Sequence, residues 1–179
     1  MTVQLAKILA LPSVAEPDSY IGEESFVKAG GRVLVLKSKL DMDSDGKEEL
    51  GITYETYHQS QTSLDPNAEW IDAITIPYFV LPGHFPHGVG MGDLAYIEYL
   101  GRSVFAICAD VGPSRKIGEA SVAVHRALGF DNVRNGHIVD VGIDSGVYTV
   151  LFPNSKIDTP CSFQAIQAFG QIQMNELLK

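Results

Sequence analysis

The sequence predicts a mainly β protein, and its strand pattern favours a β-barrel that carries one or two helices. Short segments rich in aliphatic, β-branched and aromatic residues recur along the chain between Gly, Pro and Asp residues, a pattern typical of barrels and other all-β folds. Helical spacing of apolar residues is found in one segment of the C-terminal half, and capping residues mark a second, shorter helix. A chain of 179 residues can form one domain with a core, whereas two independent domains would be cramped.

The expected strands begin after an N-terminal arm, residues 1–24, that is predicted to be irregular. They cover residues 32–39, 51–58, 74–81, 93–100, 102–109, 135–141 and 146–152. Gly101 is expected to join two of them as a hairpin, and Pro77 argues against a central ladder position within the third. Residues 25–179 are therefore expected to form a single β-barrel domain.

Two helices are expected. Ser121 is a good N-cap for a short helix that runs to Leu128, and Gly129 is expected to end it. Residues 162–178 have the apolar spacing of a C-terminal helix.

Composition limits the possible partners. The net charge of −9 and the pI near 4.9 indicate a surface that repels nucleic acid and anionic membranes and attracts polycations. The charge therefore argues against nucleic acid as a partner. No apolar run reaches the ~18 residues of a membrane helix, so no membrane partner is expected either. The protein is expected to be a monomer. The short apolar run 8–11, which Pro12 interrupts, is a poor signal peptide.

The sequence gives no sign of a cofactor. It has no P-loop, dinucleotide fingerprint or nucleophile elbow, and its five histidines do not have the spacing of a metal site. The two cysteines, Cys108 and Cys161, could form a disulfide or remain free thiols in the core.

Two carboxylates stand at the ends of expected elements. Asp110 closes the apolar strand 102–109, and Glu119 lies nine residues on, after a Gly-Pro turn and just before the helix cap Ser121. Elements of fixed geometry joined by a tight loop can hold two carboxylates at the separation that acid/base hydrolysis of a glycosidic bond needs. The alternative is a surface turn with two solvated acids.

The stretch around this pair, ICADVGPSRKIGEAS, resembles the core motif of the glycoside hydrolase family 75 chitosanases. Three further segments agree in order: LDMDSDG (40–46), QTSL (61–64) followed by IDAITIPYFVLP (71–82), and GIDSGVYTVLF (142–152). The likeness covers about residues 37–153. It implies a secreted endo-chitosanase that needs no cofactor, inverts the anomeric centre, and uses Asp110 and Glu119 as its catalytic pair. The acidic loop departs from the family pattern at Ser44, where a Cys is expected.

The run GDLAYIEYLGRSVFAICADVGP…IGEASVAVHRALG has a more distant likeness to double-psi β-barrels, as in RlpA-like and expansin-like domains. It implies a six-stranded double-psi β-barrel with a short helix after the catalytic corner and a C-terminal helix. In that comparison Glu119 falls where those barrels place their working Asp.

We expect Glu119 to be the general acid and Asp110 the general base. Ile117 and Ala120 flank Glu119 with apolar surface that would favour its protonated form. Arg115 and Lys116 would oppose this if they pointed inward, and the two roles would then be reversed. Inversion requires the carboxyl groups to be roughly 6.5–9.5 Å apart.

Several residues are candidates for binding substrate. Asp41, Asp43 and Asp45 form half of a calcium loop that lacks its bidentate Glu. They could be an acidic hairpin turn, a contact for glucosamine ammonium groups, or a cation site.

Smaller polar and aromatic groups complete the candidate set. Hydrogen bonds to sugar hydroxyls are expected from Gln61, Thr62 and Ser63, although a loop that caps a strand is equally compatible. Asp144 could line the substrate-binding cleft, or it could only stabilise the Asp-Ser-Gly turn in which it lies. The candidates for stacking on sugar rings, with core packing as the alternative, are Tyr54, Tyr57, Trp70 and Tyr78.

Two other functions are compatible with the same barrel. One is a non-hydrolytic, expansin-like polysaccharide-binding barrel, and the other is a peptidoglycan-cleaving enzyme.

Overall fold

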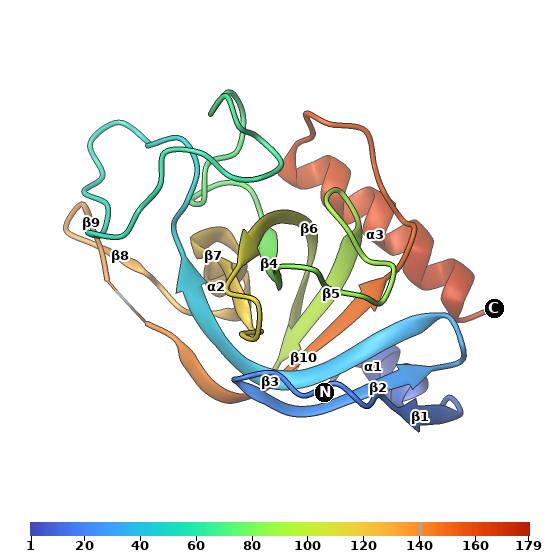
Figure 1. The fold of residues 1–179 in the computed structure, drawn as a ribbon. Coiled ribbons are helices and arrows are strands. Elements are labelled where there is room, and N and C mark those ends of the chain that lie inside the picture. The colour runs from blue at the N-terminus through green and yellow to red at the C-terminus, as the bar shows by residue number, and fades with distance from the viewer. Residues whose placement is uncertain (140) are drawn as a thin grey trace.

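The fold is a closed six-stranded β-barrel, seen in a computed structural model that describes residues 1–139 and 141–179. Around the barrel the strands follow the order β3 (Val33–Asp43), β10 (Ile143–Phe152), β5 (Leu94–Tyr99), β6 (Arg102–Gly112), β4 (Tyr78–Pro82) and β7 (Glu119–Ser121), and β7 pairs with β3 to close the ring (Figure 1). The β3–β7 and β4–β6 pairs are parallel, and the other barrel pairs are antiparallel. The prediction of a mainly β barrel is confirmed.

In the described residues, three helices and two small ribbons surround the barrel. The helices are α1 (Val3–Leu9), α2 (Val122–Leu128) and α3 (Phe163–Leu177). Strands β1 (Ser13–Ala15) and β2 (Glu23–Ala29) extend the sheet beyond β3, and β8 (Val133–Arg134) pairs with β9 (His137–Ile138). None of the described helices is long and apolar enough to cross a membrane.

The N-terminal arm is not irregular, and this expectation was wrong. Thr2 caps α1 by accepting a hydrogen bond from the backbone N–H of Leu5, and Leu5 and Ile8 are fully buried. The arm is ordered by tertiary partners, because Thr2 also donates to the buried carboxylate of Glu98 in β5 and β1 pairs with β2.

Most of the other expected elements are present. The expected hairpin of residues 93–100 and 102–109 corresponds to β5 and β6, and the expected strands 32–39 and 146–152 correspond to parts of β3 and β10. Ser121 caps α2 and Gly129 ends it in the left-handed conformation, as expected, and Ser162 caps α3. Both cysteines are free.

Three expected strands differ. Residues 51–58 form turns with a single bridge from Thr53 to His137, because no continuous neighbouring strand is at hand. In the segment 74–81 the strand starts only at Tyr78, since the carboxylate of Asp72 accepts from the N–H of Ile74 and holds a turn. The expectation for 135–141 reduces to β9, and residue 140 lies outside the described residues.

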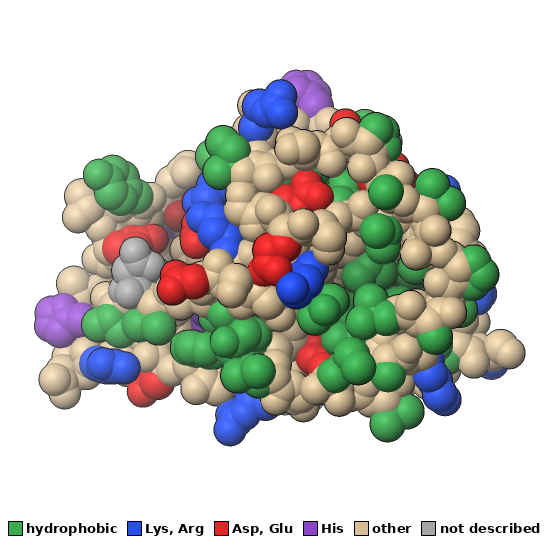
Figure 2. Space-filling view, turned by 90° about the horizontal axis from the view of Figure 1, so that it is seen from below, with side chains coloured by type: hydrophobic (Ala, Val, Ile, Leu, Met, Phe, Trp, Pro, Cys, Tyr) green, Lys and Arg blue, Asp and Glu red, His purple; other side chains and the backbone are tan. Residues whose placement is uncertain are grey.

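The apolar alternation of the strands separates two cores. Leu34 and Leu36 of β3 belong to one buried cluster, and Val33 and Val35 belong to the other, which also contains residues of α1 and α3. Gly170 lets α3 lie directly on Phe105 of β6, where a Cβ atom would be 2.2 Å from the ring. Seen from below, charged side chains gather near the centre of the face, and apolar ones gather toward the side of α1 and β1 (Figure 2).

Candidate functional site

The expected catalytic pair meets at one end of the barrel. In the sheet register, Val80 of β4 pairs with Asp110 of β6 on one side and with Glu119 of β7 on the other. Glu119 in turn pairs with Asp41 across the parallel β3–β7 ladder. Residues from four strands are therefore brought to one place by the closure of the barrel.

Asp110 is held by one of its two carboxylate oxygens. Asp110 is only 9 % exposed. Its Oδ1 atom accepts three hydrogen bonds: from the N–H of Ser63 at 2.9 Å, from the hydroxyl of Ser63 at 2.6 Å and from the N–H of Val111 at 2.8 Å. The N–H of Leu64 donates to the carbonyl of Ala109 and fastens this loop to β6. Three donors on Oδ1 fix the orientation of the carboxyl group and leave Oδ2 for chemistry.

The neighbouring polar residues of the same loop behave differently. Thr62 is buried, and its Oγ1 accepts from the N–H of Asp65 as a turn cap. Gln61 is exposed, and within the described part of the chain it has no recorded contact with the carboxylates. Of the three expected substrate contacts, Ser63 is therefore the one recorded in contact with a residue of the expected catalytic pair, Asp110, within the described chain.

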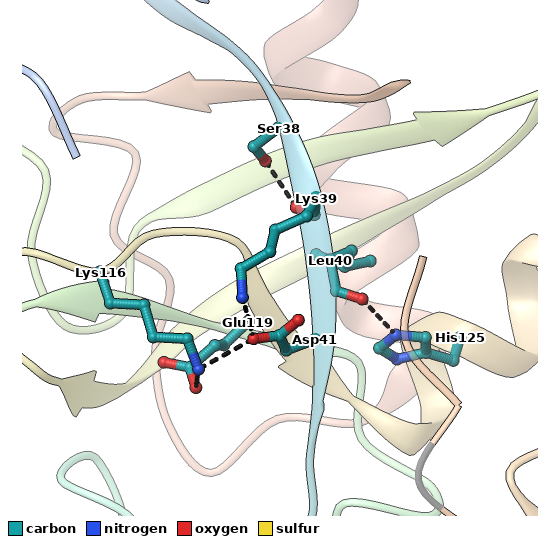
Figure 3. Close-up of polar contacts among 7 residues, drawn as sticks. All are labelled: Ser38, Lys39, Leu40, Asp41, Lys116, Glu119 and His125. Atoms are coloured by element: carbon teal, nitrogen blue, oxygen red, sulfur yellow. Dashed lines mark hydrogen bonds and ion pairs between the residues drawn. The ribbon is translucent and has the colours of Figure 1, made fainter. Parts of the chain in front are cut away.

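Glu119 is paired with a lysine (Figure 3). Nζ of Lys116 lies 2.6 Å from Oε1 of Glu119 and 2.9 Å from Oδ2 of Asp41, and Lys39 also donates to Asp41. Partial burial disfavours the charged form of Asp41, but hydrogen bonds from Lys39 and Lys116 outweigh it and lower the pKa of Asp41. Lys116 thus points toward Glu119, and its positive charge opposes the effect that the apolar neighbours of Glu119 were expected to have.

The backbone of β3 beside these residues is fixed by buried side chains. Oγ of Ser38 donates to the carbonyl of Lys39, and Nε2 of His125 on α2 lies 3.2 Å from the carbonyl oxygen of Leu40 (Figure 3). These bonds hold the β3 backbone at the two residues before Asp41 and so fix the position of Asp41.

Asp43 and Asp45 point toward Asp110. The hydroxyl oxygen of the fully buried Tyr78 lies 2.7 Å from Oδ1 of Asp43 and 2.9 Å from the carbonyl oxygen of Asp45, so its single proton is shared between these two acceptors. The N–H of Gln59 donates to Oδ1 of Asp45. Burial raises the pKa of Asp43 to about 6, and the charges of Asp110 and Glu119 add to this. Burial and then the charge of Asp43 raise the pKa of Asp45 to about 7.

Among the residues that the structure describes, one group of carboxylates is close enough to hold a cation. Oxygen atoms of Asp43, Asp45 and Asp110 lie within 4.8 Å of one another. Asp41 is turned away to its lysines, so the three aspartates of the DxDxDG loop do not converge as they would in a calcium loop. The loop is not an exposed hairpin turn either, because Ser44 and Asp45 are buried.

The remaining candidates lie apart from this group. Asp144 is exposed in the bulge of β10, and no contact with the carboxylates is recorded for it in the described chain. Tyr78 belongs to the core, so it does not stack on a sugar.

Sequence analysis missed the hydroxyl of Tyr78 and the role of Lys39. Lys39 and Asp41 are two residues apart in an expected strand, so their side chains lie on the same face, and this spacing could have predicted their ion pair. The sequence holds no comparable signal for Tyr78.

A scan against models of known protein families finds no match to this chain, and a search of curated proteins finds none either. Function therefore has to be inferred from the residues of the site and from the motif resemblance.

Proposed function

We propose that this protein is an endo-acting chitosanase that hydrolyses β-1,4 glucosamine linkages with inversion, using Asp110 and Glu119 as its two carboxyl groups. The observation that carries the proposal is the register of β4, in which Val80 has Asp110 on one side and Glu119 on the other. These are the Asp and the Glu that the family 75 resemblance implies.

The spacing suits an inverting reaction. Two strand spacings of about 4.8 Å put the backbones of Asp110 and Glu119 roughly 10 Å apart, and the directions of the two side chains set the separation of the carboxyl groups within that frame. An inverting enzyme needs room for a water molecule between its acid and its base, and a retaining enzyme needs a shorter separation. One carboxyl group protonates the glycosidic oxygen as its bond to C1 breaks, and the other takes a proton from the water that attacks C1.

The charge of the site suits a cationic polymer. The carboxylates of Asp43, Asp45 and Asp110 lie together, and among the described residues no Lys or Arg is recorded in contact with them. Ammonium groups of glucosamine units would relieve the repulsion among these carboxylates. The net charge of −9 acts in the same direction over a longer range.

We also propose that the barrel is of the double-psi kind. The two parallel pairs, β3–β7 and β4–β6, support this, because a six-stranded barrel of simple hairpins would be antiparallel throughout. The Gly112–Pro113 corner after β6 and the Ser-capped helix α2 after β7 agree with the resemblance.

The test is the release of reducing ends from highly deacetylated chitosan, with the product anomer followed by NMR. Asp110→Asn and Glu119→Gln should each keep the melting temperature and lose ~10²–10⁴-fold in rate, the usual contribution of a positioned acid or base. Glu24→Gln, which removes a carboxylate from a surface ion pair with Lys37, is the control and should keep full activity.

Other outcomes would point elsewhere. Full activity in either catalytic variant would refute the assignment of the pair. Chitosan binding without cleavage would favour the expansin-like function, and cleavage of peptidoglycan alone would favour the peptidoglycan-cleaving enzyme.

A further inference from the structure

The segment between β3 and β4 contains no helix and no strand, yet bonds within it and to its neighbours hold its first part in place (Figure 1). The N–H of Gly46 donates to the carbonyl of Gln59, and the N–H of Gln59 donates to Oδ1 of Asp45. A single bridge joins Thr53 to β9. The histidine of this part of the chain, His58, therefore stands on an ordered backbone.

The imidazole ring of His58 is held in one orientation. Its Nδ1 atom lies 2.8 Å from the carbonyl oxygen of Ser44. Because a carbonyl oxygen only accepts hydrogen bonds, Nδ1 is the nitrogen that carries the proton of this bond. The ring packs on Tyr54 with the ring centroids 4.4 Å apart, and the side chain is only 7 % exposed. Nε2 is thereby aimed in a fixed direction.

Nε2 of His58 is buried and has no hydrogen-bond partner in the part of the chain that the structure describes. A buried polar atom without a partner costs free energy, and in a native structure it calls for an explanation such as a bound water or ion. The group that faces it is the carboxylate of Glu48, whose Oε1 lies 3.6 Å from Nε2. This separation is longer than the about 2.7–3.2 Å of a hydrogen bond.

The same separation suits two ligands of one metal ion. Zinc binds histidine nitrogen and carboxylate oxygen at about 2.0–2.2 Å, and two such ligands in a tetrahedral arrangement lie roughly 3.4 Å apart. The side chain of Glu48 is 64 % exposed. It can therefore adjust as an ion enters, and water can reach the remaining coordination positions.

Two features of the surroundings agree with a bound cation. Histidines that bind metals usually donate their other ring N–H to a carbonyl or a carboxylate, which fixes the tautomer, and the bond from Nδ1 to Ser44 is such a contact. Negative charge also collects here. Burial raises the pKa of Tyr54, and the charges of neighbouring carboxylates, Glu49 and Glu48 among them, add to this effect. A divalent cation is attracted to such a place.

We propose that Nε2 of His58 and Oε1 of Glu48 are the protein ligands of a divalent transition-metal ion such as Zn²⁺, with water in the other positions. A site that combines imidazole with carboxylate favours such ions over Mg²⁺ and Ca²⁺, which prefer oxygen ligands alone. The two residues lie ten positions apart in a segment without regular structure, so no sequence spacing marks the site. The proposal is independent of the chitosanase function.

The first experiment titrates Zn²⁺ into the whole protein at neutral pH by calorimetry. His58→Asn keeps an N–H near the position of Nδ1 and removes Nε2, while Glu48→Gln changes an exposed side chain and should fold like the wild type. The wild type should bind one ion, and each variant should bind it at least ~10-fold more weakly, since even the loss of a supporting contact costs that much. The control is His84→Asn, at an exposed histidine whose φ of +63° asparagine tolerates.

The second experiment follows the ring proton signals of the histidines by NMR. Zn²⁺ should shift the His58 signal and should raise the melting temperature of the wild type and of His84→Asn, but not of the two site variants. Mg²⁺ should leave the His58 signal in place, and an equal shift with Mg²⁺ would contradict coordination by Nε2.

Three further results would overturn the proposal. A wild type that does not bind Zn²⁺ would show that His58 and Glu48 form an ion pair only. Unchanged affinity in either site variant would place the ion elsewhere. A shift confined to His87, which lies 2.6 Å from Asp18 and 3.6 Å from Glu16, would assign the ion to that histidine instead.

Discussion

Gly112 and Glu119 are so close that a Cβ atom on Gly112 would lie 2.8 Å from Oε2 of Glu119. The same Cβ would lie 3.0 Å from Cγ1 of Val80, the residue that separates Asp110 and Glu119, the proposed catalytic pair, in the sheet. Because Gly112 has no side chain, the end of β6 leaves the space beside it for the Glu119 carboxylate and for Val80. A glycine two residues after Asp110 is part of the geometry of the pair.

Gly112→Ala should displace the Glu119 carboxylate, since the end of a flexible side chain yields before the backbone does. We expect kcat to fall roughly 10–100-fold, because misplacements of up to about 1 Å have effects of this size, while the melting temperature changes little. The matched control is Gly83→Ala, at the residue that follows β4, where a Cβ atom would make ordinary contact, 3.7 Å from Cγ1 of Val111. Equal kcat values for the two variants would show that Gly112 does not position Glu119.

Ser63→Ala removes the hydroxyl that donates to Oδ1 of Asp110 but leaves the backbone donors of Ser63 and Val111. A hydrogen bond to a charged group contributes about 1.5–3 kcal/mol, and the remaining donors compensate in part. We therefore expect kcat to fall on the order of 10-fold, with KM nearly unchanged. Ser60→Ala, at an exposed position of the same loop, is the control. Steady-state kinetics of both variants check this, and a change confined to KM would assign Ser63 to substrate binding.

Asp43→Asn should change the pH dependence of stability. The pKa of Asp43 is raised from its ordinary value of 3.8 to about 6 in the folded protein, so the folded state binds the proton more tightly than the unfolded state. The wild type then loses stability as the pH rises from about 4 through 6, by up to about 3 kcal/mol. Asparagine keeps an acceptor for the hydroxyl of Tyr78 and has no charge to bury.

The melting temperature of Asp43→Asn relative to the wild type should accordingly be higher at pH 8 than at pH 4. Thermal unfolding across this pH range measures the difference. Asp144→Asn, which changes an exposed carboxylate, should show no such trend. A constant difference between Asp43→Asn and the wild type would mean that Asp43 is not destabilised by its surroundings.

Local signals predicted those parts of the fold that local interactions determine. Ser121 and Gly129 mark the ends of α2 because capping bonds lie within a few residues of sequence. Gly101 marks the hairpin of β5 and β6 for the same reason. By contrast, α1 was missed because buried partners such as Glu98 of β5 order its N-terminus, and the alternation in residues 51–58 found no neighbouring strand.

The candidate site shows the same division. Asp110 and Glu119 could be named from their positions at element ends and from the motif resemblance. Their meeting across Val80 depends on closure of the barrel, which no local pattern contains. The inward direction of Lys116 depends on Ile21, almost a hundred residues earlier in the chain, which holds its loop.

The final prediction concerns the degree of acetylation of the substrate. Deacetylated chitosan carries ammonium groups that can approach Asp43, Asp45 and Asp110, whereas fully acetylated chitin carries none and gains nothing from this group of carboxylates. We expect the initial rate to fall steadily as acetylation rises in a series of chitosans of equal length at fixed pH, and cellulose and crystalline chitin to be nearly inert. Added salt should raise KM for the deacetylated polymer, because the exposed part of the attraction is screened.

Asp45→Asn tests the electrostatic origin of this preference when rates are compared above pH 7, where Asp45, whose pKa burial and the charge of Asp43 raise to about 7, is charged; the variant then removes one charge from the group without touching Asp110 or Glu119. The ratio of rates on weakly and strongly acetylated chitosan should fall in this variant, while Asp144→Asn, whose carboxylate is exposed, should keep the ratio of the wild type. Because Gln59 donates its N–H to Oδ1 of Asp45, an asparagine oxygen can accept the same bond and the loop should stay in place. A rate that climbs with acetylation in the wild type would contradict the role of these carboxylates and would favour a chitinase or a peptidoglycan-cleaving enzyme.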